Sequence, residues 1–175
     1  MSKTQIVTPK GTAQWPWLIN PDTKFDDNGK YKTDILFSKD DAKDLMKKCK
    51  ELFLDEFGET GIKAAKWPFS VDEESGGVRF RAKSSNKPAL FDSQGQVIKG
   101  DLNVGTGSTI KVAGVLSTYS AGGNTGVTMY LNAVQVIDLV EFGSNAFSAE
   151  DGGYVHTEQQ VNGSDEQTDD PFADF

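Results

Sequence analysis

The sequence predicts a mainly β protein, an OB-fold antiparallel barrel with one amphipathic helix, followed by a disordered acidic C-terminal tail. Three observations lead to this expectation: five or six short segments have strand character, one segment has helical periodicity, and the end of the chain has acids but no cations. Strands separated by turns argue against a parallel βαβ sheet. A long twisted sheet of this size hides its edges by closing into a barrel. We assign residues 1–147 to the barrel domain and residues 148–175 to the tail.

The helix is expected between Ser38 and Gly58. Ser38 suits the N-cap, Asp41 follows three residues later as in a capping box, and Gly58 is placed to end the helix. Cys49, the single cysteine, is predicted to be a buried, inert thiol because it lies on the apolar stripe of the helix. That stripe has spacings of three and four residues and consists of Ala42, Leu45, Met46, Cys49, Leu52, Phe53 and Phe57. The outer face is expected to be solvated and carries Lys39, Lys43, Lys47, Lys48 and Lys50.

The strands are predicted from alternation and from turn residues. Val78, Phe80 and Ala82 alternate with three cations, so we expect the apolar residues, Phe80 included, to face the core. An Asn-Gly pair within 26–29 and a Gly within 92–95 are typical of hairpin turns, and a glycine-rich segment, 120–126, joins the last two strands. The predicted strands span residues 30–37, 77–83, 89–98, 109–119 and 127–142.

The charge of the chain is divided unevenly. The formal net charge is -8, which by itself argues against a polyanion as ligand. Of the 26 acidic residues, eight lie in 148–175, and the other 18 equal the 18 lysines and arginines, all of which lie in 1–147. The body is therefore neutral and the tail holds the whole excess. A segment of this composition cannot bury enough apolar surface to order itself, and charge asymmetry of this kind indicates an interaction tail.

Signals for catalysis, metal binding and membrane insertion are weak. The only histidine, His156, lies in the tail, where no scaffold would orient it. The segment 105–108 lacks the lysine of a phosphate-binding loop and precedes a strand, and 26–29 reads as a turn instead of a calcium loop. We expect no enzyme activity, no cofactor and no metal. Residues 1–10 have no signal-peptide core and no apolar run could cross a bilayer, so we expect a soluble intracellular protein without a membrane partner.

Signals for nucleic-acid binding are stronger. Residues 76–90 contain no acid, and their cations are Arg79, Arg81, Lys83 and Lys87. Binding to single strands without sequence preference needs such cations and aromatic faces on which bases stack. Trp15 and Trp17 flank Pro16, and we expect both to point the same way in an extended segment. For each aromatic, core packing is the alternative, and for Tyr119 groove and core are equally favoured. The candidate platforms are Trp15, Trp17, Trp67, Tyr119 and Tyr130.

The tail ends in an unusual pattern of aromatic and acidic residues. Two phenylalanines serve no folding purpose in a disordered segment, so we predict a docking role for them. The same composition also fits a polyanion mimic of DNA that occupies the groove of its own barrel. The candidate partner-binding residues are Asp169, Asp170, Phe172, Asp174 and Phe175.

Several segments together carry a resemblance to a known family. The chain resembles the replicative single-stranded DNA-binding proteins of podoviruses, the gene 2.5 type. The resemblance covers most of the chain, and it rests on the order of the segments and on the acidic tail, since no single motif is diagnostic. The tail is shorter and less densely acidic than in that family, and the segment between helix and basic strand is compressed. The segments are 11–13, 21–22, 29–34, 92–95, 105–112, 126–127, 136–143 and the tail that ends in Asp174-Phe175.

The resemblance implies an OB-fold with an added helix. It implies coating of single strands in phage DNA replication, recombination and repair, and contacts of the tail with the phage polymerase and helicase-primase. It also implies a possible homodimer and a location in the cytoplasm of an infected bacterial host. Carried over by position, the DNA-binding region includes Arg79, Arg81, Lys83, Lys87 and Tyr119. Lys63 and Lys66 precede it, and Lys111 lies in one of the resembling segments.

A second interpretation stays open. The chain could be a phage protein-interaction module on an OB-like barrel that does not bind DNA. In that case the basic strand would be no more than solvated surface. Quenching of tryptophan or tyrosine emission by oligo-dT would distinguish the two interpretations, because stacking on a base changes the emission.

Overall fold

The computed structural model describes residues 2–24, 27–141, 152 and 154 of the chain. Apart from residues 152 and 154, the tail lies outside the described residues, and so do its five candidate partner-binding residues and His156. Part of the 26–29 turn also lies outside them. The described chain forms one α-helix, one short 3-10 helix and eight strands. In chain order these are β1 (Lys3–Val7), β2 (Gly11–Asp22), β3 (Lys30–Phe37), α1 (Lys39–Phe57), η1 (Ile62–Ala64), β4 (Phe69–Val71), β5 (Val78–Ser84), β6 (Ala89–Phe91), β7 (Thr109–Ala121) and β8 (Asn124–Asp138).

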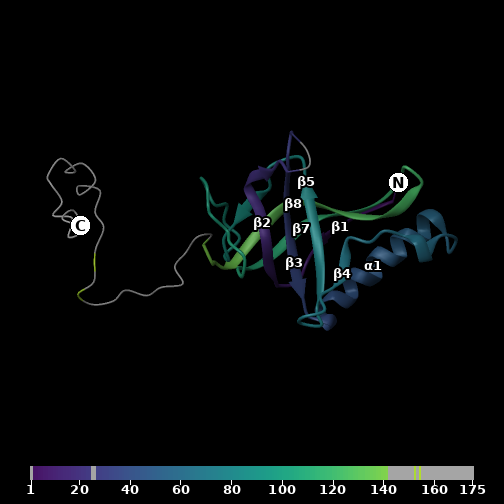
Figure 1. Ribbon diagram of the computed structural model, residues 1–175, viewed down its shortest axis with the longest axis horizontal. Coiled ribbons are helices and arrows are strands. Elements are labelled where there is room, and N and C mark those ends of the chain that lie inside the picture. The colour runs from purple at the N-terminus through teal and green to yellow at the C-terminus, as the bar shows by residue number, and fades with distance from the viewer. Residues whose placement is uncertain (1, 25–26, 142–151, 153, 155–175) are drawn as a thin grey trace, which may run out of the picture. The chain divides into compact units, whose positions relative to one another are not determined.

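Five of the strands pair in a ring. β7 pairs with β2, β2 with β3, and β3 with β5, all antiparallel. β5 then pairs with β8 in parallel, and β8 returns to β7 as an antiparallel hairpin. This is an OB-like fold, with the helix between two early strands of the ring, so the predicted mainly β, OB-type fold with one helix is confirmed for the described residues (Figure 1). β1 extends the sheet beside β7, β4 pairs with β5, and β6 joins β8.

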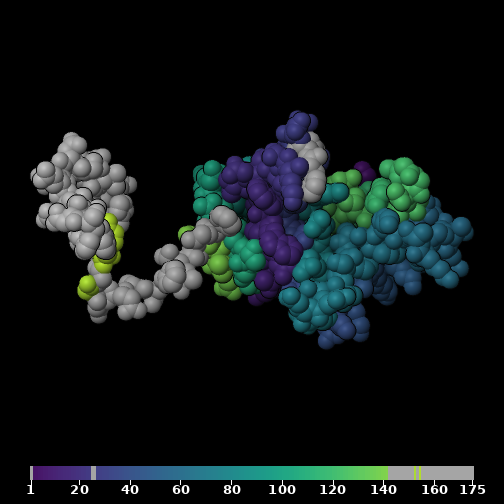
Figure 2. All heavy atoms as spheres, in the orientation of Figure 1, coloured from purple at the N-terminus to yellow at the C-terminus, as the bar shows by residue number. Residues whose placement is uncertain are grey.

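Three strands, β1, β2 and β4, were not among the strand predictions. β2 is the most consequential of them, because it belongs to the ring. Its sequence mixes aromatic, polar and proline residues, and no single alternation runs through the whole segment. The register of β2 against β3 shifts between Gln14 and Trp17 and again before Asp22, so irregular pairing hides the period of two. Figure 2 shows the corresponding face, on which the early strands in purple meet the teal segment that includes β5.

The core inside the ring of strands includes the alternate residues that the pattern of β5 predicted. Phe80 and Ala82 are fully buried, and Ile35 on β3 lies directly opposite Phe80. The β7–β8 hairpin is tighter than expected, since its strands run to Ala121 and Asn124. Gly122 and Gly123 have φ values of 57° and 81°, as a two-residue turn with positive φ at both positions requires.

The helix begins and ends where its capping residues predict. The backbone N–H of Asp41 donates to Ser38 Oγ at 3.2 Å, and the N–H of Gly58 donates to the carbonyl of Leu54 at 2.8 Å. Cys49 and Phe53 are fully buried, while the five lysines of the outer face are exposed. α1 packs against β3, β7 and β8 (Figure 1). In the described part of the chain, no helix combines the length and apolar character of a membrane span.

The segment 89–98 forms the predicted turn but only a short strand. The N–H of Gly95 donates to the Asp92 carbonyl at 3.0 Å, and Phe91 bridges Val97 across the turn. The remainder of β6 pairs in parallel with β8, with Leu90 opposite Val134.

Candidate functional site

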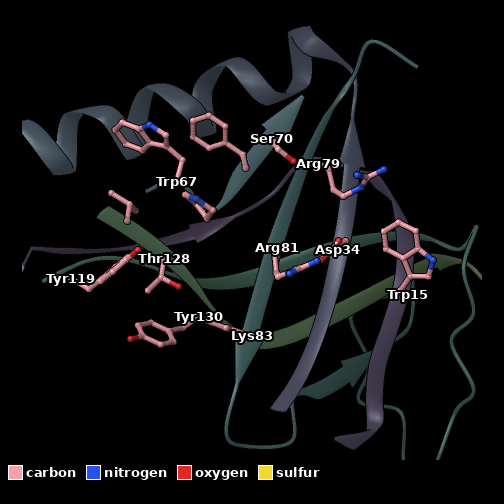
Figure 3. Close-up of a pocket in the computed structure, with 13 residues that line it drawn as sticks. Trp15, Asp34, Trp67, Ser70, Arg79, Arg81, Lys83, Tyr119, Thr128 and Tyr130 are labelled. Atoms are coloured by element: carbon pink, nitrogen blue, oxygen red, sulfur yellow. Dashed lines mark hydrogen bonds and ion pairs between the residues drawn. The ribbon is translucent and has the colours of Figure 1, made fainter. Parts of the chain in front are cut away.

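A groove of about 590 Å³ lies across the outer face of β3, β5 and β8. Figure 3 shows Trp15 and Arg79 toward one end, the Arg81–Asp34 pair in the middle, and the other aromatic side chains toward the opposite end. The groove therefore has a cationic centre between aromatic groups. Its lining consists of Trp15, Asp34, Trp67, Pro68, Phe69, Ser70, Arg79, Arg81, Lys83, Tyr119, Val127, Thr128 and Tyr130.

The alternation of β5 places its cations on this face. Because Phe80 and Ala82 point into the barrel, Arg79, Arg81 and Lys83 point outward. The β3–β5 register sets Asp34 opposite Arg81 and Lys32 opposite Lys83. Side chains directly opposite each other on one face are in contact range, so the register decides which cation meets a carboxylate.

Arg81 forms a two-point ion pair with Asp34. Its Nε donates to Asp34 Oδ1 at 2.8 Å and its Nη2 donates to Oδ2 at 3.2 Å. The Asp34 side chain is 5% exposed, whereas that of Arg81 is 60% exposed. The hydrogen bonds with Asp34 raise the pKa of Arg81 above its ordinary value. The guanidinium is thus held in one orientation, and its other N–H groups remain available to a ligand in the groove.

Arg79 is held by two partners and covered by a third. Its Nε donates to Gln14 Oε1 at 2.6 Å, and its Nη2 donates to Asp72 Oδ1 at 3.0 Å. Its guanidinium carbon lies 5.1 Å from the centroid of the Trp15 ring. The pKa of Asp72 is lowered, first by the hydrogen bond from Ser75 and further by the charge of Arg79.

Lys83 and Tyr130 occupy the β5–β8 side of the groove, where they lie opposite each other in register. Lys83 is exposed and, within the described residues, forms no ion pair. Tyr130 is 44% exposed, and Tyr119 on β7 is half-buried. For Tyr119 the sequence favoured groove and core equally, and in the structure the residue lines the groove.

Trp67 connects the groove to the core. Its ring packs 5.5 Å from Phe53 of α1 and stacks 5.7 Å from Phe69, with ring planes 22° apart. Phe69 in turn contacts the buried Phe80 at 5.1 Å. This ladder of aromatic rings gives Trp67 a rigid backing, while the half-buried ring still lines the groove.

Five of the sequence-predicted site residues lie outside the groove lining. Trp17 lines a neighbouring cavity of about 280 Å³, which it shares with Trp15. Lys87 pairs with Asp101 at 3.0 Å, and Lys111 lies on β7 opposite Gln135. Lys66 is exposed, and its backbone bonds to the β8 end of the hairpin. The five are Trp17, Lys63, Lys66, Lys87 and Lys111.

The structure brings together Trp15, Arg79, Arg81, Lys83 and Tyr119 as predicted candidates in one groove. It adds Trp67 and Tyr130, which the sequence had marked only as possible platforms. It also adds two carboxylates, Asp34 in the lining and Asp72 beside it, which the sequence analysis missed. No sequence signal identifies them, because they meet the arginines only through strand register.

Metal and thiol chemistry find no support in the described residues. No group of three or more His, Cys, Asp or Glu side chains in that part of the chain could hold a metal ion. Burial raises the pKa of Cys49 to about 12, in agreement with the predicted inert thiol.

No protein-family model and no curated protein sequence matches the chain. Solved structures do. Gp2.5, a single-stranded DNA-binding protein of bacteriophage T7, is 20% identical with a TM-score of 0.68, over 89% of this chain and 100% of that one. The single-stranded DNA-binding protein of bacteriophage Enc34 is 14% identical in two structures. Its C-terminal truncation has a TM-score of 0.65 over 78% of this chain and 87% of that one. Its complex with ssDNA has a TM-score of 0.62 over 78% and 88%.

The chain has the fold of these phage proteins. In OB-folds, the face of the second and third barrel strands and the adjacent loops bind oligonucleotides. In the ring of this chain those strands are β3 and β5, which carry Asp34, Arg79, Arg81 and Lys83. The groove thus lies on the face that OB-folds use for binding.

Proposed function

We propose that this chain binds single-stranded DNA without sequence preference in the groove across β3, β5 and β8. One observation carries the proposal: the groove combines exposed cations with aromatic rings on the binding face of an OB-fold. Cations neutralise phosphates, and every base has a face that stacks on an aromatic ring. The structures to which the chain is similar are of single-stranded DNA-binding proteins, and this supports the same ligand.

The absence of sequence preference follows from the kinds of side chain in the lining. Base identity is read mainly by hydrogen bonds to base edges, for which Asn and Gln amides and arginines free to form two parallel hydrogen bonds are suited. The described lining of the groove contains neither Asn nor Gln, and its arginines are oriented by carboxylates. Stacking on the aromatic rings and charge contacts with phosphates, both of which tolerate any base, are therefore the main contacts in this proposal.

The test is a fluorescence titration of the full chain with oligo-dT, oligo-dC and a duplex of equal length. We expect quenching of tryptophan or tyrosine emission, similar affinities for the two single strands, and much weaker binding of the duplex, whose bases are already stacked. Affinity should fall as salt rises. Equal affinity for duplex and single strand, or binding without any change in emission, would contradict the groove as the binding site.

The biological role that we propose is the coating of single strands during phage DNA replication, recombination and repair. The protein would act without catalysis, in the cytoplasm of the infected host. Its tail would recruit the phage polymerase and helicase-primase, and a homodimer is part of this proposal. Support comes from the sequence resemblance and from the pattern of Asp169, Asp170, Phe172, Asp174 and Phe175.

The tail is also proposed to compete with DNA for the groove. A flexible chain of 28 residues, as the composition of 148–175 predicts, has a root-mean-square reach of about 29 Å, compared with a body radius of gyration of roughly 15 Å. A tethered competitor acts at about millimolar effective concentration, so even weak docking of its carboxylates would lower the apparent DNA affinity.

Two deletions separate competition from recruitment. Removing residues 149–175 should tighten DNA binding most at low salt and abolish recruitment of the partners. Removing Phe175 alone should impair recruitment, measured by pull-down of polymerase, and leave DNA affinity nearly unchanged. If the large deletion leaves DNA affinity unaltered at low salt, competition is wrong and only docking remains.

A further inference from the structure

Trp15 has a backbone conformation that its neighbours must enforce. Its φ is 48°, and among the described residues it is the one non-glycine residue with positive φ. This left-handed region disfavours a side chain with a Cβ, and the following Pro16 restricts the backbone of Trp15 further. Such a conformation persists only where surrounding contacts determine it, and these positions concentrate at ligand sites.

The loop 105–108 supplies part of that constraint. The N–H of Trp15 donates to Thr106 Oγ1 at 3.0 Å. Two residues before Trp15, the Ala13 carbonyl accepts from the Gly107 N–H at 2.9 Å, and the Ala13 N–H donates to the Ser108 carbonyl at 2.8 Å. Residues 105–108 therefore hold the irregular part of β2 in place, and with it the backbone of Trp15 that carries the indole.

Arg79 supplies the other part of the constraint on Trp15, through its contact with the indole ring. Gln14 accepts from its Nε and Asp72 accepts from its Nη2, and its guanidinium carbon lies over the Trp15 ring, 5.1 Å from the centroid. Only 24% of the Arg79 side chain is exposed, and its charge already faces a carboxylate at 3.0 Å. Trp15 is 57% exposed, and since one ring face contacts Arg79, the free surface is the opposite face and the edges.

We propose that Arg79 is a positioning residue that fixes Trp15 as a stacking platform for a base, and that it is not a phosphate ligand. Asp72 and Gln14 anchor Arg79 in this role, and Thr106 holds the backbone of Trp15. The inference rests on the proposed function of single-stranded DNA binding. It reverses the simplest expectation for a carboxylate beside a DNA groove, because Asp72 then supports binding in spite of its charge.

Whether Asp72 strengthens or weakens DNA binding distinguishes the positioning role of Arg79 from a role as phosphate ligand. Asp72→Asn is compared with Glu73→Gln, which removes the same charge from the adjacent, exposed residue. A positioning role predicts that Asp72→Asn binds oligo-dT at least about threefold more weakly than Glu73→Gln, with the same salt slope. A phosphate-ligand role predicts the opposite: without the competing carboxylate Arg79 would hold its phosphate more tightly, and Asp72→Asn would bind oligo-dT more tightly than Glu73→Gln. Equal affinities of the two variants would also overturn the proposal.

A double-mutant cycle tests whether Arg79 acts through Trp15. Loss of one stacking platform weakens binding about 5- to 150-fold, which sets the range for Trp15→Ala. We expect Arg79→Met to reproduce most of that loss with an unchanged salt slope, and to add nothing in the Trp15→Ala background. Additive losses, or a slope that falls by about 0.7 in Arg79→Met, would overturn the proposal.

A milder pair of variants covers the case in which Arg79→Met does not fold. Thr106→Val removes the acceptor of the Trp15 N–H, and Thr106→Ser restores a hydroxyl. Weaker binding in Thr106→Val and recovery in Thr106→Ser are expected, whereas equal binding of both would count against the clamp. If the unaltered chain fails to bind oligo-dT, the proposed function fails together with this inference. If it binds and only the cycle is additive, the positioning role alone is wrong.

Discussion

Lys83 offers the sharpest test of how the groove contacts phosphates. It lines the groove and is exposed, and in the described chain no carboxylate pairs with it. Lys83→Met keeps the length of the side chain and removes its charge. Because the residue lies on the outer face of β5, between the buried Ala82 and the loop that follows the strand, the change should leave the barrel intact.

The magnitude follows from counting phosphate contacts. The basic row read from the sequence, Arg79, Arg81, Lys83 and Lys87, gives four contacts and a salt slope near 3, at about 0.7 per contact on single strands. The structure reduces this number, because Lys87 lies outside the groove and Arg79 is assigned to Trp15. Two contacts remain, Arg81 and Lys83, with a slope of about 1.4.

Removing Lys83 should halve that slope to about 0.7. The affinity loss then depends on salt: extrapolated from 1 M, the missing contact costs about fivefold at 0.1 M and about eightfold at 0.05 M, and nearly nothing at 1 M. Fluorescence titrations with oligo-dT at 0.05, 0.1 and 0.2 M NaCl measure the slope directly.

Lys63→Met is the matched control, since it removes the same charge from an exposed position outside the groove. Its slope should equal that of the unaltered chain. The reasoning is refuted if Lys83→Met keeps the original slope. It is also refuted if Lys63→Met lowers the slope as much, because binding would then depend on diffuse charge instead of this groove.

Three further predictions concern single residues. Tyr130→Ala should weaken oligo-dT binding by about 1–3 kcal/mol without changing the salt slope. Because Tyr130 is 44% exposed, the melting temperature should fall little, and a large thermal shift would instead place Tyr130 in the core. Because the pKa of Asp72 is lowered in the folded chain, its contribution to stability is present above the ordinary carboxyl pKa of 3.8 and is lost as pH falls through the lowered value. Urea unfolding between pH 2 and 5 should show a weaker pH dependence in Asp72→Asn, and identical profiles would contradict the ion pair. Cys49, with a pKa of about 12 and no exposure, should resist a disulfide reagent at pH 8 until denaturant unfolds the chain, and rapid labelling of the native protein would contradict its burial.

The parts of the fold that the sequence predicts are those with local periodicity. Helix α1 follows from a spacing of three and four residues between caps only 20 residues apart, Ser38 and Gly58. The outward row of β5 follows from strict alternation, which assigns Arg79, Arg81 and Lys83 to one face before any partner strand is known. In a strand the period of two decides which side chains share a face, and in a helix the period of 3.6 decides which side chains form one stripe. Neither depends on contacts with distant parts of the chain.

Charge clusters, in contrast, did not indicate which surface they would occupy. Lys87 is the last cation of the basic row in sequence, yet it lies beyond the end of β5 and pairs with Asp101. Lys63 and Lys66 precede β4 and lie outside the groove. A run of cations without acids predicts a basic segment, and it is the path of the backbone through turns that divides such a segment among several faces.

By itself, the sequence determined the helix, the cationic face of one strand, the buried thiol and the division of charge between body and tail, because each depends on residues near one another in the chain. Only the tertiary structure decided that β2 joins the ring, that β5 and β8 pair in parallel, and that Asp34 meets Arg81 across 47 positions of sequence. It also decided that Trp15 takes a strained conformation over Arg79, 64 positions away, with Gln14 as a partner of the same arginine. Register and bulges set these contacts, and they are settled by the packing of distant strands against one core, which no local pattern records.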